Sequence, residues 1–183
     1  LMDEPLGALD KRLRDQMQIE VKRLHKELGA TIVYVTHDQE EAMALSDRIC
    51  LMNAGAIEQI GTPDNLYFRP QSLFAAEFFG APNTLDGEVR AVAEGEVHVA
   101  VADEVVRARS DDHGISPGDT VILVLRPEVL RILGPGESPV NALPATFASA
   151  TVTGPLTQYR LIGPNGIGFN SLPLTTQAAP PRI

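Results

Sequence analysis

The chain has 183 residues, of which 44% are apolar, and its 24 acidic against 15 basic side chains give a net charge of −9. This length and apolar content can support one or two folded domains, whereas the negative charge repels phosphate backbones and argues against a nucleic-acid-binding protein. A single cysteine, Cys50, excludes an internal disulfide framework, and no apolar run approaches the roughly 18 residues of a membrane-spanning helix.

Residues 11–28 carry the first clear periodicity. Apolar side chains recur there every three or four positions, which predicts an amphipathic helix, and Gly29 follows at the position that commonly ends a helix. The apolar stripe consists of Leu13, Met17, Val21, Leu24 and Leu28.

Residues 30–36, ATIVYVT, are β-branched and almost wholly apolar. Such a segment is typical of a strand buried on both faces of a parallel sheet. It runs directly into His37, after which Asp38 and Glu41 have the spacing of a capping box and predict the start of another helix. The apolar stripe of that helix continues through Ala42, Leu45 and Ile49.

Further strands and helices are expected before residue 81. Residues 48–52 and 56–60 flank Asn53-Ala54-Gly55 and predict two short strands around a turn, with Cys50 as a small core residue. Thr62 followed by Pro63 predicts the start of a helix, and a short helix follows within residues 71–80.

The composition of the sequence changes after Gly80, where proline and glycine become more frequent. Short β-rich stretches separated by turn residues predict a small antiparallel barrel or sandwich. We therefore place a domain boundary at residues 81–83, with one domain over residues 1–80 and a second over residues 83–183.

The first ten residues, LMDEPLGALD, place the acid pair Asp3 and Glu4 where a strand can end, the position at which ligands bind in open α/β sheets. Together with the helix, the strand and the stretch THDQEEAMALSDRI, this segment resembles the ATPase subunit of ATP-binding-cassette (ABC) transporters. Apolar-DEP is similar to the Walker B motif of that family, GALD to its D-loop, and Thr36-His37-Asp38 to its H-loop. His37 follows Glu4 by 33 positions, as the family's spacing requires.

The resemblance implies a role for each of these side chains in phosphoryl transfer. Asp3 would hold Mg²⁺ through water, and Glu4 would polarise the water that attacks the γ-phosphate of ATP. His37 would contact that phosphate and help to hold Glu4 and the water. Asp10, which closes the D-loop, would reach across the interface between two ATPase subunits, and it is also well placed to cap the helix that follows.

The second half is similar to the accessory TOBE domain, an OB-like β-barrel that follows the ATPase domain in many importers of small solutes. The stretches that carry this resemblance are GAPNTLDGEV, LRPEVLRI and NALPATFASATVTGPLTQYRL. The implied fold class is the α/β C-terminal part of a P-loop NTPase domain followed by an all-β OB-like barrel.

Other parts of a complete ATPase site do not occur in these 183 residues. Neither the phosphate-cradling pattern of glycine, four residues, glycine, lysine and serine or threonine nor an LSGGQ-type signature is present. We expect the chain to be a fragment that alone neither binds ATP with useful affinity nor hydrolyses it. The remaining histidines, His25, His98 and His113, have no partner at metal-ligand spacing, so zinc is not expected.

For the complete protein, the resemblance implies a homodimer of ATPase subunits that sandwiches two ATP molecules at the cytoplasmic face of the inner membrane. Its partners would be two transmembrane permease subunits and an extracytoplasmic solute-binding protein. The segment GTPDNLYFRPQSLFAAEFFGAPN is most similar to importers of polyamines, with iron(III), sugar and phosphonate importers as other readings.

Two other functions stay open at this point. The chain could be a non-catalytic regulatory remnant whose β-rich half binds a small ligand. A chromosome-maintenance or repair ATPase shares the core motifs, but such proteins do not usually carry the second domain.

Overall fold

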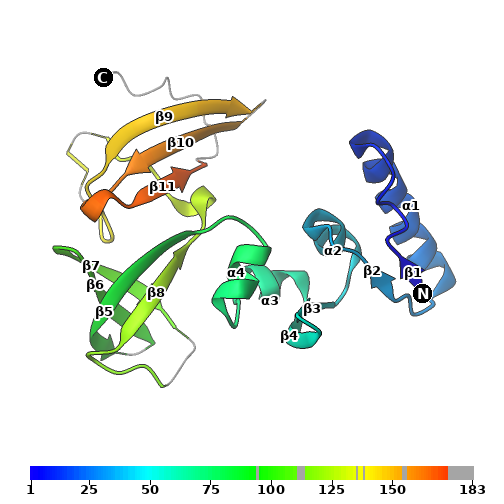
Figure 1. The fold of residues 1–183 in the computed structure, drawn as a ribbon, viewed down its shortest axis with the longest axis horizontal. Coiled ribbons are helices and arrows are strands. Elements are labelled where there is room, and N and C mark those ends of the chain that lie inside the picture. Colours follow the sequence, from blue (N-terminus) through cyan, green and yellow to red (C-terminus); the bar gives the residue numbers. More distant parts are fainter. Residues whose placement is uncertain (94, 111–113, 135, 138, 154–155, 173–183) are drawn as a thin grey trace. The chain divides into compact units, whose positions relative to one another are not determined.

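A computed structural model describes residues 1–93, 95–110, 114–134, 136–137, 139–153 and 156–172 of the chain (Figure 1). The chain divides into two compact units, Leu1–Gly80 and Ala81–Ile183. The assignment of residues 1–80 and 83–183 as two functional domains remains a prediction.

The first unit begins with a parallel strand–helix–strand arrangement. Strand β1 (Met2–Asp3) pairs in parallel with strand β2 (Tyr34–Val35), so that Met2 lies opposite Tyr34. Helix α1 (Lys11–Leu28) connects the two strands. Because the strands are parallel, the segments that follow them leave the sheet at the same edge.

The expected strand over residues 30–36 is much shorter than predicted, and its burial on both faces is wrong. Only two of its residues pair as a strand, and the side chains of Val33 and Val35 are 58% and 45% exposed. Among the described residues β2 pairs with β1 alone. The two-residue strand β1 cannot cover the seven residues 30–36, so side chains of that stretch remain exposed.

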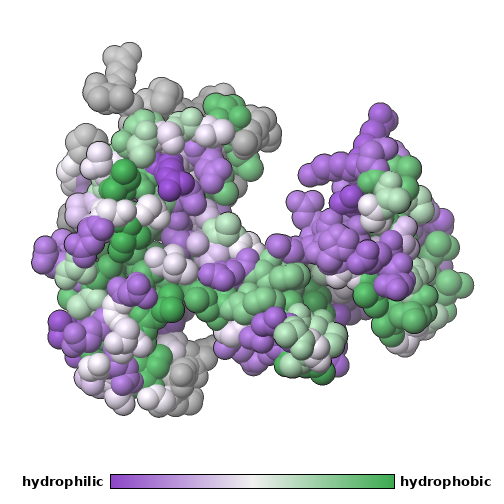
Figure 2. All heavy atoms as spheres, in the orientation of Figure 1, coloured by the Kyte–Doolittle hydropathy of each residue, from purple (hydrophilic) through white to green (hydrophobic). Residues whose placement is uncertain are grey.

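The prediction of helix α1 is confirmed at both ends. The side chain of Asp10 accepts a hydrogen bond from the backbone N–H of Leu13 at 3.0 Å, and Gly29 ends the helix in the left-handed conformation at φ 60°. No residue of α1 is buried, however, so the apolar stripe is formed but not covered. Figure 2 shows hydrophilic side chains over α1 and hydrophobic ones beside β1 and β2.

The rest of the first unit follows the sequence prediction closely. It comprises α2 (Gln39–Leu45), the antiparallel strands β3 (Ile49–Asn53) and β4 (Ala56–Gly61), α3 (Pro63–Phe68) and α4 (Leu73–Phe78). Ala54 and Gly55 both have positive φ, as a two-residue hairpin turn of the primed type requires. Thr62 and Ser72 cap the last two helices.

Two expectations about β3 are wrong. Ile49 lies in this strand, as the predicted strand over residues 48–52 requires, and not in the stripe of the preceding helix, which ends at Leu45. Cys50 is exposed and not in the core. The reason is strand alternation: Ile49 and Leu51 point into the core of the unit, so Cys50 between them points out.

The second unit contains two antiparallel sheets. The first has the strand order β7-β6-β5-β8, from β5 (Asn83–Ala93), β6 (Glu96–Val101), β7 (Glu104–Arg109) and β8 (Thr120–Leu125). The second has the order β11-β10-β9, from β9 (Thr146–Thr153), β10 (Leu156–Ile162) and β11 (Gly168–Ser171). Two short 3-10 helices, η1 (Pro127–Val129) and η2 (Pro164–Gly166), lie in the connections. Among the described residues neither sheet closes into a barrel, so the OB-like barrel is not confirmed.

Valine-rich faces of the first sheet form the core of this unit, and Phe169 of β11 packs into it. The buried members are Leu85, Val89, Val97, Val99, Val101, Val106, Leu123 and Phe169. The two sheets are also joined by the buried Asn83, whose amide donates to the carbonyl of Asn170 at 2.8 Å and accepts from its N–H at 2.6 Å.

Candidate functional site

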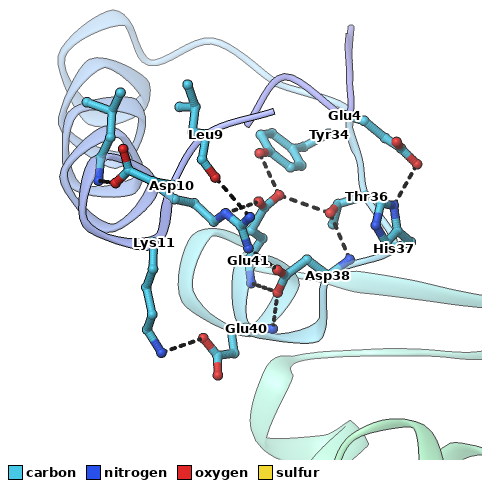
Figure 3. A network of polar contacts seen from close by, with 12 residues as sticks. Glu4, Leu9, Asp10, Lys11, Tyr34, Thr36, His37, Asp38, Glu40 and Glu41 are labelled. Carbon is cyan, nitrogen blue, oxygen red and sulfur yellow. Dashed lines mark hydrogen bonds and ion pairs between the residues drawn. The ribbon is translucent and has the colours of Figure 1, made fainter. Parts of the chain in front are cut away.

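Glu4 and His37 come together at the edge of the β1–β2 sheet. Glu4 directly follows β1, and His37 lies two positions after β2. The imidazole Nδ1 of His37 donates to Oε1 of Glu4 across 2.8 Å (Figure 3). The two side chains are 51% and 77% exposed, so the pair is open to a ligand from solution.

The pair has a defined electrostatic character. The hydrogen bond that His37 donates to Glu4 raises the pKa of His37 above the ordinary 6.5, and the negative charge of Glu4 raises it further. Desolvation lowers this pKa by less than either effect, and the charges of Asp38 and Glu41 raise it by smaller amounts. The protonated imidazolium is therefore favoured, and in that form both ring nitrogens are donors.

The backbone at Glu4 is strained. Its φ of 43° lies in the left-handed region, which costs a non-glycine residue about 1–3 kcal/mol. The conformation is held by a hydrogen bond from its N–H to the carbonyl of Val35 at 2.9 Å and by one from the N–H of Gly7 to its own carbonyl at 3.3 Å. This left-handed conformation turns the chain sharply at the residue whose carboxylate contacts His37.

The turn after β2 is held by a network of hydrogen bonds that the sequence predicts only in part. Asp38 caps α2 by accepting from the N–H groups of Glu40 and Glu41 at 2.8 and 3.1 Å. The reciprocal half of the expected capping box is wrong, because the N–H of Asp38 donates to Thr36 Oγ1 at 2.9 Å and not to Glu41. Glu41 instead turns inward.

Glu41 is the buried centre of this network, with only 1% of its surface exposed. Its Oε2 accepts from the hydroxyl groups of Tyr34 and Thr36, each at 2.9 Å. Burial, together with the bond to Glu41, raises the pKa of Tyr34, so its hydroxyl stays protonated as a donor.

Arg14 also takes part in this network, although its contacts were not predicted from the sequence. Its guanidinium donates from Nη1 to Asp38 Oδ2 at 2.7 Å and from Nη2 to the carbonyl of Leu9 at 3.1 Å. Its Nε lies 3.7 Å from Oε1 of Glu41. The available signal was the position of Arg14 one turn into the helix that follows the GALD segment, but spacing alone does not show that it turns back toward that segment.

These side chains enclose a small pocket of about 30 Å³, lined by Glu4, Gly7, Arg14, Thr36, His37, Asp38 and Glu41. This is room for a water molecule, whereas a small-molecule ligand site occupies about 300–1,000 Å³. The described site therefore suits a water held beside Glu4, and it does not form a complete nucleotide pocket.

The other two predicted site residues lie outside this pocket. Asp3 is exposed at the end of β1, opposite Val35. Asp10 caps α1, which was one of its two expected roles. The described residues contain no group of three or more His, Cys, Asp or Glu that could hold a metal ion, but Mg²⁺ usually needs only one or two carboxylates besides water and phosphate. His113 lies outside the described residues.

No helix in the part of the chain that the structure describes is both long enough and apolar enough to cross a membrane.

Comparison with known proteins adds a consistent set of relatives, although no protein-family model matches the chain. A protein of Rubrobacter xylanophilus is 44% identical over 168 residues, covering 91% of this chain and 44% of the relative. A protein of Trichormus variabilis is 41% identical over 175 residues, covering 94% of this chain and 46% of the relative. A third, from Lawsonia intracellularis, is 51% identical over 133 residues, covering 72% and 36% respectively.

All three relatives are named spermidine/putrescine import ATP-binding protein PotA. The chain spans less than half of their length.

Proposed function

Since this chain belongs to the ATP-binding subunits of ABC-type solute importers, we propose that it forms the hydrolytic end of a subunit that couples ATP hydrolysis to polyamine uptake. The observation that carries the proposal is the direct contact between Glu4 and His37 at the edge of a parallel sheet. The names of the relatives support spermidine or putrescine as the cargo.

Glu4 is the residue we assign to the attacking water. One of its carboxylate oxygens, Oε1, is engaged by His37, which leaves Oε2 to accept a proton from a water in the small pocket. As the water oxygen bonds to the γ-phosphorus of ATP, the bond to the leaving oxygen of ADP breaks, and the proton passes to Glu4.

His37 is the residue we assign to the γ-phosphate. Because Nδ1 faces Glu4, only Nε2 is available to a ligand. In the protonated imidazole Nε2 carries a hydrogen and can donate to a phosphate oxygen, whereas in the neutral form with Nδ1–H it cannot. The raised pKa of His37 thus favours the form that can bind both groups at once.

Asp3 is the carboxylate we assign to Mg²⁺, through water. Its exposed position at the end of β1, one residue before Glu4, fits a hard cation that keeps most of its water ligands. When bound, Mg²⁺ supplies charge neutralisation on the phosphates.

The remaining parts of the proposal follow from the family. Two subunits sandwich two ATP molecules, with Asp10 near the interface, and they dock on two permease subunits at the cytoplasmic face of the inner membrane. An extracytoplasmic binding protein delivers the cargo. The second unit is the TOBE domain, supported by its two antiparallel sheets and by the buried Phe169 and Asn83 between them.

Uptake of labelled spermidine and putrescine tests this proposal in a strain whose gene for this subunit is deleted. The deletion should abolish high-affinity uptake, the intact gene should restore it, and a gene carrying Glu4→Gln should not. Glu20→Gln, which changes an exposed acid of α1 in the same way, is the matched control and should restore uptake. Normal polyamine uptake in the deletion strain would remove polyamines as the cargo.

A further inference from the structure

The guanidinium of Arg14 joins two segments that are far apart in the sequence. One is the D-loop segment, residues 7–10, whose backbone carbonyl at Leu9 accepts from Nη2. The other is the turn after β2, where the Asp38 carboxylate next to His37 accepts from Nη1. A single planar group thus spans from the segment before α1 to the segment that carries His37.

The turn itself has a rigid support. The side chains of Arg14 and Asp38 are 28% and 24% exposed, and that of Glu41 below them is 2% exposed. Glu41 accepts from Thr36, and Thr36 in turn accepts from the N–H of Asp38. The residues on both sides of His37 are therefore fixed by hydrogen bonds, although His37 itself is exposed.

One nitrogen of the Arg14 guanidinium makes no hydrogen bond within the part of the chain that the structure describes. Its buried Nε has no hydrogen-bond partner in the described residues and lies 3.7 Å from Glu41. Leu9 and Asp38 consequently provide the two hydrogen bonds that orient the guanidinium, and Glu41 attracts it by charge alone. A movement of the Leu9 carbonyl would displace a group that also holds Asp38.

We propose that Arg14 is a positioning residue that ties the D-loop backbone at Leu9 to the Thr36–Asp38 turn and so sets how firmly His37 is held against Glu4. The part of this inference that concerns ATP hydrolysis rests on the proposed function, but the mechanical link does not. Lysine cannot replace arginine here, because two acceptors in different directions require the fixed fork of a guanidinium.

A titration of His37 by nuclear magnetic resonance tests the link in this chain without any nucleotide. The His37 signal is assigned by its loss in His37→Asn, and its pKa is compared in the unchanged chain, Arg14→Lys, Arg14→Gln and the control Arg12→Gln. Arg12 lies on the exposed side of the same helix, so its substitution removes the same charge without touching either segment. The signal of His25, near the end of α1, reports whether the helix remains folded.

The sign of the change separates positioning from simple electrostatics. Loss of a positive charge near His37, which also leaves Asp38 unpaired, should raise the pKa of His37. Loss of positioning weakens the hydrogen bond to Glu4 and should lower the pKa toward 6.5. We expect a lower pKa in both Arg14 variants and an unchanged one in Arg12→Gln.

An unchanged or raised pKa of His37 in Arg14→Lys would overturn the proposal, and this conservative variant decides the matter if Arg14→Gln does not fold. In the complete subunit, Arg14→Lys should lower kcat for ATP and leave KM unchanged. If the titration behaves as expected and the complete subunit has no ATPase activity, the positioning link stands and the proposed function fails.

Discussion

Replacement of the buried Glu41 by glutamine should destabilise the first unit far more than the same change at its neighbour Glu40. Glu41 is 1% exposed, and its carboxylate accepts from Tyr34 and Thr36 and faces Arg14. Glu40 forms an ion pair with Lys11 at 3.8 Å in which the two side chains are 79% and 78% exposed. The two positions therefore differ in surroundings while the chemical change is identical.

The expected loss follows from the three contacts of Glu41. Glutamine keeps an acceptor oxygen, so both hydroxyl groups stay bonded, but each bond to a charged acceptor becomes neutral at a cost of about 1 kcal/mol. The new amide group also presents hydrogen to the Nε–H of Arg14 in place of an attractive oxygen, which adds roughly another 1 kcal/mol. The total is about 2–3 kcal/mol for Glu41→Gln, against about 0.5 kcal/mol or less for Glu40→Gln.

Urea unfolding followed by far-ultraviolet circular dichroism measures both variants, since α1 is a main source of helical signal. With an m value of about 2 kcal/mol/M, Glu41→Gln should lower the midpoint by roughly 1 M urea. Equal midpoints for the two variants would refute the reasoning that Glu41 is a buried, charge-bearing support of the turn.

Three further changes have expected outcomes. Thermal unfolding should show that His37→Asn lowers stability at about pH 5.5 and much less at about pH 8.5. The raised pKa of His37 adds stability that is fully present below 6.5 and is lost as pH rises through the raised pKa. Equal effects of the substitution at both pH values would contradict the pairing of His37 with Glu4. Gly29→Ala should cost about 1 kcal/mol in urea unfolding through backbone strain alone, since φ is 60° and an added Cβ meets nothing within 4 Å; a stabilised variant would contradict the cap. Asn83→Asp should cost about 3 kcal/mol in the second unit, because it removes the amide that donates to the carbonyls of Leu125 and Asn170 and leaves a carboxylate facing them at a buried position. A cost below about 0.5 kcal/mol would show that the two sheets do not depend on Asn83.

The sequence predicted the local elements well where the signal was itself local. The periodic stripe of residues 11–28, the left-handed Gly29 and the caps at Asp38 and Thr62 depend on neighbours within one helical turn, and all were confirmed. The motif spacing likewise singled out Glu4 and His37, which the parallel pairing of β1 and β2 brings to 2.8 Å.

Burial was predicted less well, because it depends on which elements meet in space. Residues 30–36 have the composition of a buried strand, yet Val33 and Val35 are exposed beside a two-residue partner. Cys50 lies on the outer side of β3. Strand alternation places Cys50 opposite Ile49 and Leu51, but the sequence alone does not show which of the two faces is buried.

The supporting network could not be deduced from spacing. A glutamate three residues after Asp38 normally completes a capping box, and only the position of Tyr34 explains why Glu41 turns inward. Arg14 and Asp38 are 24 positions apart, so their contact depends on how α1 packs beside α2.

ATP turnover by the complete subunit tests the central assignment of Glu4 most directly. In Glu4→Gln, turnover should fall at least about 100-fold, the lower range for loss of a general base, while ATP is still bound. Glu20→Gln should retain the full rate. Full turnover in Glu4→Gln would contradict the account, because the residue that meets His37 at the sheet edge would then play no part in hydrolysis.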